Sequence, residues 1–176
     1  MLDDTAVQVG IVMGSDNDWP RIKAAAAALE EFGVAYEARV LSAHRTPEAV
    51  EAYAKSAAQR GLKVIIAAAG GAAHLAGVLA SHTTLPVIGL PVPTELMGGL
   101  DSLLSMVQMP GDVPVATVGV GVGGARNAGL LALQILALHN PQLQQKLLAF
   151  KRGLVDQMAA KNAALEARIA QEKQKP

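Results

Sequence analysis

Five short apolar stretches alternate with helix-like stretches along this chain, and this alternation constrains its fold more than any other feature. The predicted strands are residues 7–13, 34–41, 63–68, 85–90 and 113–118. The predicted helices are residues 19–32, 47–60, 72–81, 100–108, 123–138 and a last helix that begins at 141. Strands that alternate with helices are typical of a parallel sheet covered by helices on both faces. We therefore predict an α/β fold: a three-layer, doubly wound, parallel five-stranded sheet of the flavodoxin-like type.

The same pattern divides the chain into two parts. Residues 1–140 are expected to form one flavodoxin-like domain that carries the functional site. Residues 141–176 read as a helical extension with apolar side chains at helical spacing, namely Leu143, Leu147, Phe150, Leu154 and Met158. We expect this extension to contact a neighbouring subunit up to Met158 and to fray beyond it.

Composition excludes several classes of protein. The formal net charge is zero and aromatic residues make up 3%, which argues against nucleic-acid binding. The absence of cysteine excludes disulfides and thiolate metal sites. The N-terminal residues 1–4 lack the basic region of a signal peptide, and Gly70-Gly71 interrupts the one long apolar stretch. We therefore expect a cytoplasmic protein without a membrane partner.

The middle of the chain is poor in charge. Between residues 64 and 125 the charged side chains are Glu95, Asp101 and Asp112 alone. A single soluble domain seldom leaves so long a segment without charge. We expect part of this segment to be buried in a homo-oligomer.

The turn Ser42-Ala43-His44-Arg45-Thr46-Pro47 joins the second strand to the second helix. It places a hydroxyl, an imidazole and a guanidinium within four residues, and Thr46 and Pro47 suit the start of a helix. Ligands bind at the carboxyl ends of the strands in open α/β sheets. A solvated loop without function is the alternative.

The neighbouring strand-to-helix turns carry polar residues and glycines that should meet this turn at one edge of the sheet. They are Ser15 and Asp18 after the first strand, and Gly70, Gly71 and His74 after the third. Backbone N–H groups of Gly14-Ser15 and the fork of Arg45 suit a phosphate, while Asp18 can accept from ribose hydroxyls. The alternatives are helix capping for Ser15 and Asp18, and a subunit contact for His74.

Other motifs carry less weight. The segment 119–124 matches G-x-G-x-x-G, but neither a further strand nor an acidic residue at the dinucleotide-binding spacing follows it. The four histidines lack carboxylate partners at ligand spacing, so we expect no metal site. Ser42 lies near His44, but the sequence singles out no orienting acid for an acyl-transfer triad.

Several longer motifs follow one another along the chain. They are Met13-Gly14-Ser15 with Asp18-Trp19, Ser42–Pro47, Gly70-Gly71-Ala72-Ala73-His74-Leu75, Asp101-Ser102-Leu103-Leu104-Ser105, Val107-Gln108-Met109-Pro110 and Asn127-Ala128. In these motifs and their order, the chain resembles the class I bacterial N5-carboxyaminoimidazole ribonucleotide mutase family of de novo purine synthesis over about residues 7–138.

The resemblance implies a flavodoxin-like fold in a homo-octamer. It implies an isomerase that moves a carboxylate from the exocyclic nitrogen to the ring carbon of an aminoimidazole ribonucleotide, without metal, ATP or organic cofactor. A functional hand-off of substrate from the ATP-dependent carboxyaminoimidazole ribonucleotide synthase goes with it.

The resemblance also implies roles for residues of the three turns. His44 would be the acid–base catalyst, which suits an imidazole. The remaining expected substrate-binding residues are Ser15, Ser42 and Arg45 for the phosphate, Asp18 for the ribose, and Gly70, Gly71 and His74 for the imidazole and carboxylate.

Three positions depart from the family pattern. Asn17 stands where the family usually has Ser, Ala68 replaces a usual Gly, and Ala76 replaces the usual Pro after His74-Leu75. None of them changes His44 or Arg45, so the expected activity stands.

Two other functions remain as alternatives. The class II activity, direct carboxylation of aminoimidazole ribonucleotide by carbon dioxide, uses the same scaffold. A receiver-like signalling domain would need an aspartate at the end of the third strand and a lysine at the end of the fifth. Ala69-Gly70 and Val118-Gly119 stand there instead.

Overall fold

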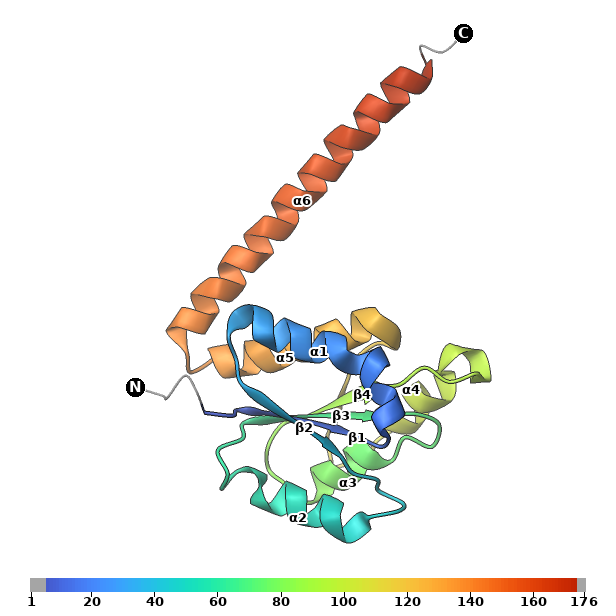
Figure 1. The fold of residues 1–176 in the computed structure, drawn as a ribbon, viewed down its shortest axis with the longest axis vertical. Coiled ribbons are helices and arrows are strands. Elements are labelled where there is room, and N and C mark those ends of the chain that lie inside the picture. Colours follow the sequence, from blue (N-terminus) through green and yellow to red (C-terminus); the bar gives the residue numbers. More distant parts are fainter. Residues whose placement is uncertain (1–5, 174–176) are drawn as a thin grey trace. The chain divides into compact units, whose positions relative to one another are not determined.

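A computed structural model describes residues 6–173 and contains the predicted parallel five-stranded sheet (Figure 1). The strand order is β2-β1-β3-β4-β5, and every neighbouring pair is parallel. The strands are β1 Val9–Met13, β2 Tyr36–Val40, β3 Val64–Ala69, β4 Val87–Pro91 and β5 Ala116–Thr117. Because the order reverses next to β1, the turns after β1, β2 and β3 meet at one edge, as the sequence predicted.

The first five helices lie in two layers that cover the sheet. They are α1 Trp19–Phe32, α2 Pro47–Ala57, α3 Leu75–Ser81, α4 Leu100–Val107 and α5 Gly121–Ala137. A sixth helix, α6 Pro141–Lys173, follows them in the chain. Short 3-10 turns, η1 Asp16–Asp18 and η2 Leu96–Gly98, precede α1 and α4. Figure 1 shows α1 and α5 on one face of the sheet and α2 and α3 on the other.

Aliphatic side chains form the core on both faces of the sheet. β1, β3 and β4 are buried along their whole length, whereas edge strand β2 is half-buried or exposed. On the face of α2 and α3, Val50, Leu79 and Met106 are buried together with β3 side chains such as Ile65. On the other face of the sheet, Gly129 of α5 lies close to Ala25 and Ala28 of α1.

Local sequence explains most helix boundaries. Pro20 lies in the first turn of α1, and Gly33 ends that helix with a left-handed φ of 76°. α2 ends at Ala57, before the predicted Arg60, and its chain turns at Gly61 with φ 98°. α3 begins at Leu75, three residues after the predicted start, because the turn before it adopts left-handed conformations.

Contacts divide the chain after Leu136 into a larger unit and a second unit that contains α6. The Asn140 side chain caps α6 by accepting a hydrogen bond from the Leu143 N–H at 3.0 Å. α6 continues to Lys173, so the prediction of fraying after Met158 is wrong as far as the structure describes the tail. Ala, Glu, Lys and Gln in that part are strong helix formers.

The structure bears only in part on the expectations about a membrane span and a signal peptide. No helix within residues 6–173 is both long and apolar enough to span a membrane. The expectation about a signal peptide concerns residues 1–4, which lie outside the described part of the chain. The placement of α6 at a subunit interface stays a prediction.

Candidate active site

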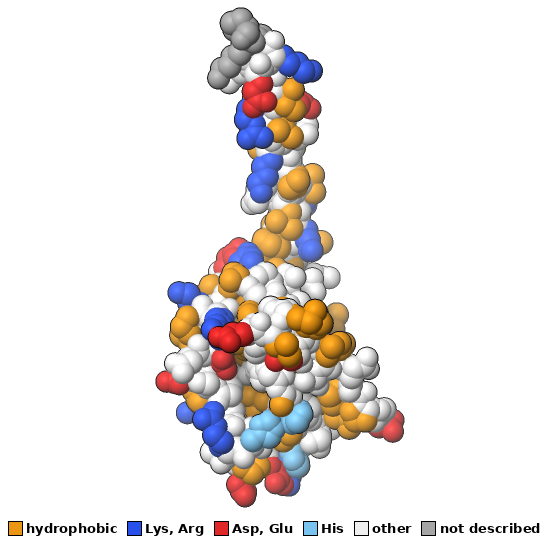
Figure 2. Space-filling view, turned by 90° about the vertical axis from the view of Figure 1, so that its right-hand side faces the viewer, with side chains coloured by type: hydrophobic (Ala, Val, Ile, Leu, Met, Phe, Trp, Pro, Cys, Tyr) orange, Lys and Arg blue, Asp and Glu red, His pale blue; other side chains and the backbone are white. Residues whose placement is uncertain are grey.

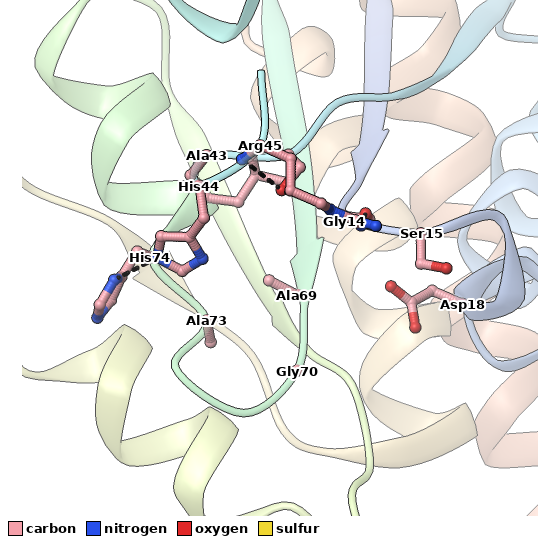
Figure 3. A pocket seen from close by; sticks show the side chains of 12 residues that line it. Gly14, Ser15, Asp18, Ala43, His44, Arg45, Ala69, Gly70, Ala73 and His74 are labelled. Atoms are coloured by element: carbon pink, nitrogen blue, oxygen red, sulfur yellow. Dashed lines mark hydrogen bonds between the residues drawn. The ribbon is translucent and has the colours of Figure 1, made fainter. Parts of the chain in front are cut away.

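A cavity of about 490 Å³ lies at the carboxyl edge of β1, β2 and β3. Its size suits a small-molecule ligand. It is lined by Gly14, Ser15, Asp18, Ser42, Ala43, His44, Arg45, Ala69, Gly70, Ala73, His74 and Leu75. Figure 3 shows His44 and His74 on one side of the cavity and Ser15 and Asp18 on the other.

Seven of the eight residues predicted for the site therefore line one cavity. Gly71 is the exception, because its backbone N–H and C=O both form hydrogen bonds with side chains of α4. The structure brings the three turns together as expected. Sequence reasoning did not assign roles to Ser102 and Ser105 of α4, although both belong to a quoted motif.

The turn that carries His44 is held by hydrogen bonds between its own residues. The Ser42 N–H donates to the Thr46 Oγ1 at 3.0 Å, and the Thr46 hydroxyl donates to the Ser42 C=O at 3.2 Å. Thr46 therefore closes the turn behind it and makes no side-chain cap to α2, contrary to the sequence-based expectation. His44 projects from the middle of this closed turn.

Arg45 joins this turn to the end of β1. Its Nη2 donates to the Gly14 C=O at 2.7 Å, and its Nε donates to the Ser42 Oγ at 3.3 Å. These bonds use two of the five guanidinium N–H donors. The expectation that the Gly14 N–H faces an anion is wrong, because that group donates to the Ala68 C=O at 3.2 Å.

His44 and His74 form a direct contact between the second and third turns. His44 Nε2 and His74 Nδ1 lie 2.8 Å apart, and the rings meet edge to face at 76°. One nitrogen must donate the hydrogen bond and the other must accept it, so the tautomer of one ring sets the role of the other ring. Both side chains are exposed. Figure 2 shows histidine side chains in pale blue on one face of the molecule.

The Ser15 side chain caps a helical turn, whereas the Asp18 side chain does not. The Ser15 Oγ accepts from the Asn17 N–H at 3.2 Å, so this side chain does cap the short turn η1. Asp18 stands at the N-cap of α1 but makes no side-chain capping bond. Burial raises the pKa of the Asp18 carboxyl, which outweighs the opposing hydrogen bond from the Ser15 segment and the charge of Arg21.

The departures from the family pattern lie outside the cavity lining. Asn17 is exposed, whereas Ala68 and Ala76 are fully buried in β3 and α3. Within residues 6–173, no three His, Asp or Glu side chains gather in a way that could hold a metal ion. The chemistry of the lining is therefore that of hydroxyls, one carboxylate, one guanidinium and two imidazoles.

Comparison with known proteins agrees with this arrangement. The model of the AIR carboxylase family matches residues 8–157. The chain belongs to the AIR carboxylase family. A family relative from Mycobacterium tuberculosis, named N5-carboxyaminoimidazole ribonucleotide mutase, is 60% identical over 159 residues, which cover 90% of each chain.

Further AIR carboxylase relatives are similar over most of their length. A protein of the same name from Vibrio cholerae is 57% identical and covers 81% of this chain and 89% of its own. The crystal structure of Treponema denticola PurE has a TM-score of 0.81 at 28% identity, and the match covers 90% of this chain and 98% of that one. Both the fold and the family expected from the sequence are thus confirmed.

Proposed function

We propose that this chain is an N5-carboxyaminoimidazole ribonucleotide mutase. It converts N5-carboxyaminoimidazole ribonucleotide to 4-carboxy-5-aminoimidazole ribonucleotide in de novo purine (IMP) biosynthesis. The observation that carries the proposal is the single cavity into which three turns bring His44, Arg45 and Asp18. Relatives at 52% to 60% identity that bear this name support the reaction.

The substrate's ribose phosphate would lie between the first two turns. Arg45 offers a planar fork for the phosphate, and the Ser15 and Ser42 hydroxyls flank it. Asp18 can accept hydrogen bonds from the ribose hydroxyls, because it is not occupied by helix capping. The ribose would thus lie beside Asp18, across the cavity from the two histidines (Figure 3).

The imidazole ring and carboxylate would then face His44 and the turn Gly70–His74. In the reaction the exocyclic N–C bond breaks, and the nitrogen gains a proton while a carbon dioxide-like fragment separates. The ring carbon then bonds this fragment and loses its own proton. His44 can give the first proton and take the second, so the isomerisation needs no net acid or base.

The third turn would form the wall behind the reacting atoms. Gly70 brings backbone close to the cavity, and His74 contacts the His44 ring on the same side of the cavity. A wall of this kind would keep the separated fragment near the ring carbon, where effective concentration favours recapture over escape.

We further propose that the chain acts as a homo-octamer in the cytoplasm and receives its substrate from the ATP-dependent carboxyaminoimidazole ribonucleotide synthase. Exposed apolar side chains in the charge-poor segment support assembly. They include Leu96, Met97, Leu104, Val107 and Val122.

An assay of purified protein with N5-carboxyaminoimidazole ribonucleotide tests the reaction. We expect the ring-carboxylated product to form in the presence of chelator and without ATP. Aminoimidazole ribonucleotide with bicarbonate as the sole substrate distinguishes the class II activity. Formation of product from this second mixture alone, or from neither, would contradict the mutase assignment.

A further inference from the structure

The turn that connects β3 to α3 adopts a backbone conformation that needs support. Gly71 has φ 67° and Ala73 has φ 40°, so two of its residues lie in the left-handed region. This region is unfavourable for alanine, which has a Cβ. Within the turn the Ala73 N–H donates to the Gly70 C=O at 3.3 Å.

Two serines of α4 bind the backbone of this turn from outside. The Ser102 Oγ accepts from the Gly71 N–H at 3.0 Å. The Ser105 hydroxyl donates to the Gly71 C=O at 3.2 Å. Both polar backbone groups of Gly71 are therefore bound to α4, thirty residues further along the chain.

Ser102 is oriented by a second contact with the end of the neighbouring strand. Its hydroxyl donates to the Val92 C=O at 2.8 Å, and the Val92 N–H donates to the Ala69 C=O at 2.9 Å. A serine hydroxyl has one proton, so this bond leaves the oxygen lone pairs for Gly71. The Asp101 carboxylate beside it accepts a hydrogen bond from the Thr94 hydroxyl at 2.6 Å.

Ser102 is fully buried and is the one polar side chain in the buried core that the structure describes. It does not line the cavity, so it does not touch the substrate's expected place. Burying a hydroxyl without bonds is costly, and here its bond to the Gly71 N–H fixes the chain segment that leads to His74. Its position is explained by the turn that it holds.

We propose that Ser102, together with Ser105, is a positioning residue that holds His74 in contact with His44. His74 follows Gly71 by three residues, and its Nδ1 lies 2.8 Å from His44 Nε2. Release of Gly71 would let the strained turn relax and move His74. The kinetic tests of this inference rest on the mutase activity proposed above.

The variant Ser102→Ala removes both bonds at once. We expect kcat to fall roughly 10- to 100-fold, since a displacement of about 1 Å in an active site has an effect of this size, with a smaller change in KM. A crystal structure of the variant should show the His44–His74 contact lengthened beyond hydrogen-bond distance. An unchanged contact together with an unchanged kcat would overturn the proposal.

A double-mutant cycle separates positioning from a general structural effect. If Ser102 acts through His74, Ser102→Ala should cause little further loss of kcat in a His74→Asn background. An equal loss in both backgrounds would show that Ser102 supports the fold in another way.

Should Ser102→Ala fail to fold, Ser102→Cys is the second variant. It keeps the side-chain size but forms only weak hydrogen bonds, so it should also lower kcat. An unchanged kcat in Ser102→Cys would contradict the proposal.

Ser81→Ala is the matched control. The Ser81 hydroxyl also donates to a backbone carbonyl, that of Val78 at 2.8 Å, but at the far end of α3. We expect wild-type kcat and an intact His44–His74 contact in this variant. If the wild-type protein lacked mutase activity, the crystallographic contact would still test the role of Ser102, so the two proposals fail separately.

Discussion

His44 projects from a turn in which the neighbouring polar side chains bind one another. Ser42 and Thr46 close the turn, and Arg45 anchors it to the Gly14 carbonyl. The backbone that carries the imidazole is therefore held in place, while the ring is exposed, contacts His74 and lines a cavity of substrate size. This combination makes His44 the residue on which the proposed chemistry depends.

His44→Asn should abolish turnover while the fold remains. Loss of an acid–base group lowers rates by about 10²- to 10⁴-fold, and an exposed side chain contributes little to stability. Steady-state kinetics and thermal unfolding measure the two effects. His82→Asn, which changes a histidine outside the cavity, is the control and should have the wild-type rate. A near wild-type rate in His44→Asn would show that another group moves the proton.

Asp18→Asn should weaken substrate binding because the amide accepts ribose hydrogen bonds less strongly than a carboxylate. Hydrogen bonds to charged groups contribute about 1.5 to 3 kcal/mol, so we expect KM to rise roughly 10- to 100-fold. As the pH falls, protonation of Asp18 should weaken ribose binding and raise the wild-type KM. Because burial raises the pKa of Asp18, this rise should begin at a higher pH than for an ordinary aspartate. A KM that is equal in wild type and variant across this range would exclude the role.

The charged form of Asp18 should favour substrate binding, but its raised pKa means that the same charge disfavours folding. The folded state binds the Asp18 proton more tightly than the unfolded state, so stability decreases as the pH rises through the interval between the two pKa values. At neutral pH the half-buried Asp18 carboxylate is therefore destabilising. We expect Asp18→Asn to unfold at an equal or higher temperature than wild type at pH 7, with the difference shrinking in acid. A variant that is less stable at pH 7 would contradict this.

Residue types and their order predicted most of the site, because parallel strands place successive turns at one edge. Hydrogen bonds across the fold could not be predicted in this way. The Arg45 bond to Gly14 and the Ser102 bond to Gly71 join residues about thirty positions apart. The serines of α4 could have been found as hydroxyls in a helix that is apolar apart from Asp101, but their partner is visible only in three dimensions.

At the scale of elements, α1 and α5 approach each other through a glycine. A Cβ on Gly129 would lie 2.5 Å from the Ala25 backbone oxygen and 2.8 Å from the Ala28 Cβ. Backbone atoms cannot yield as a flexible side chain can, so the helices would have to separate. Gly129→Ala should therefore destabilise the protein by about 1 to 3 kcal/mol, measured by denaturant unfolding.

Gly153→Ala on α6 is the matched control for this prediction. No atom lies within 4 Å of a Cβ at Gly153, and both positions are helical. Here the higher helix propensity of alanine should act alone, with a stabilising effect of about 0.5 to 1 kcal/mol if unfolding is measured globally. Stabilisation by alanine in both variants would show that helix propensity, and not the close approach, governs Gly129.

The elements themselves were predicted to within a few residues where proline or glycine marks their ends. α1 matches the prediction at both ends, because Pro20 and Gly33 fix them. β5 is shorter than expected, with two residues in the sheet, and α3 starts later. The length of β5 depends on its position at the edge of the sheet, and the start of α3 depends on the left-handed conformations of Gly71 and Ala73. Residue patterns reveal neither feature.

At the scale of the whole molecule, the charge-poor segment is not explained by the core of one chain. β3 and β4 are buried, but the later part of the segment exposes Met97 by 76%, Val122 by 71% and Leu104 by 51%. Figure 2 shows exposed hydrophobic side chains on the face that also carries the histidines. Assembly of several copies would cover such surface.

Gel filtration with light scattering tests this assembly. We expect a species of about eight times the 18.1 kDa chain mass, and Leu104→Glu should shift it towards smaller species, since a buried unpaired carboxylate is strongly unfavourable in an interface. Leu165→Glu, which lies on α6 beyond the part proposed for subunit contact, should leave the mass unchanged. A monomer for the wild-type chain would mean that these apolar side chains face water. The charge-poor segment would then need another explanation, although the cavity and its chemistry belong to one chain and would stand.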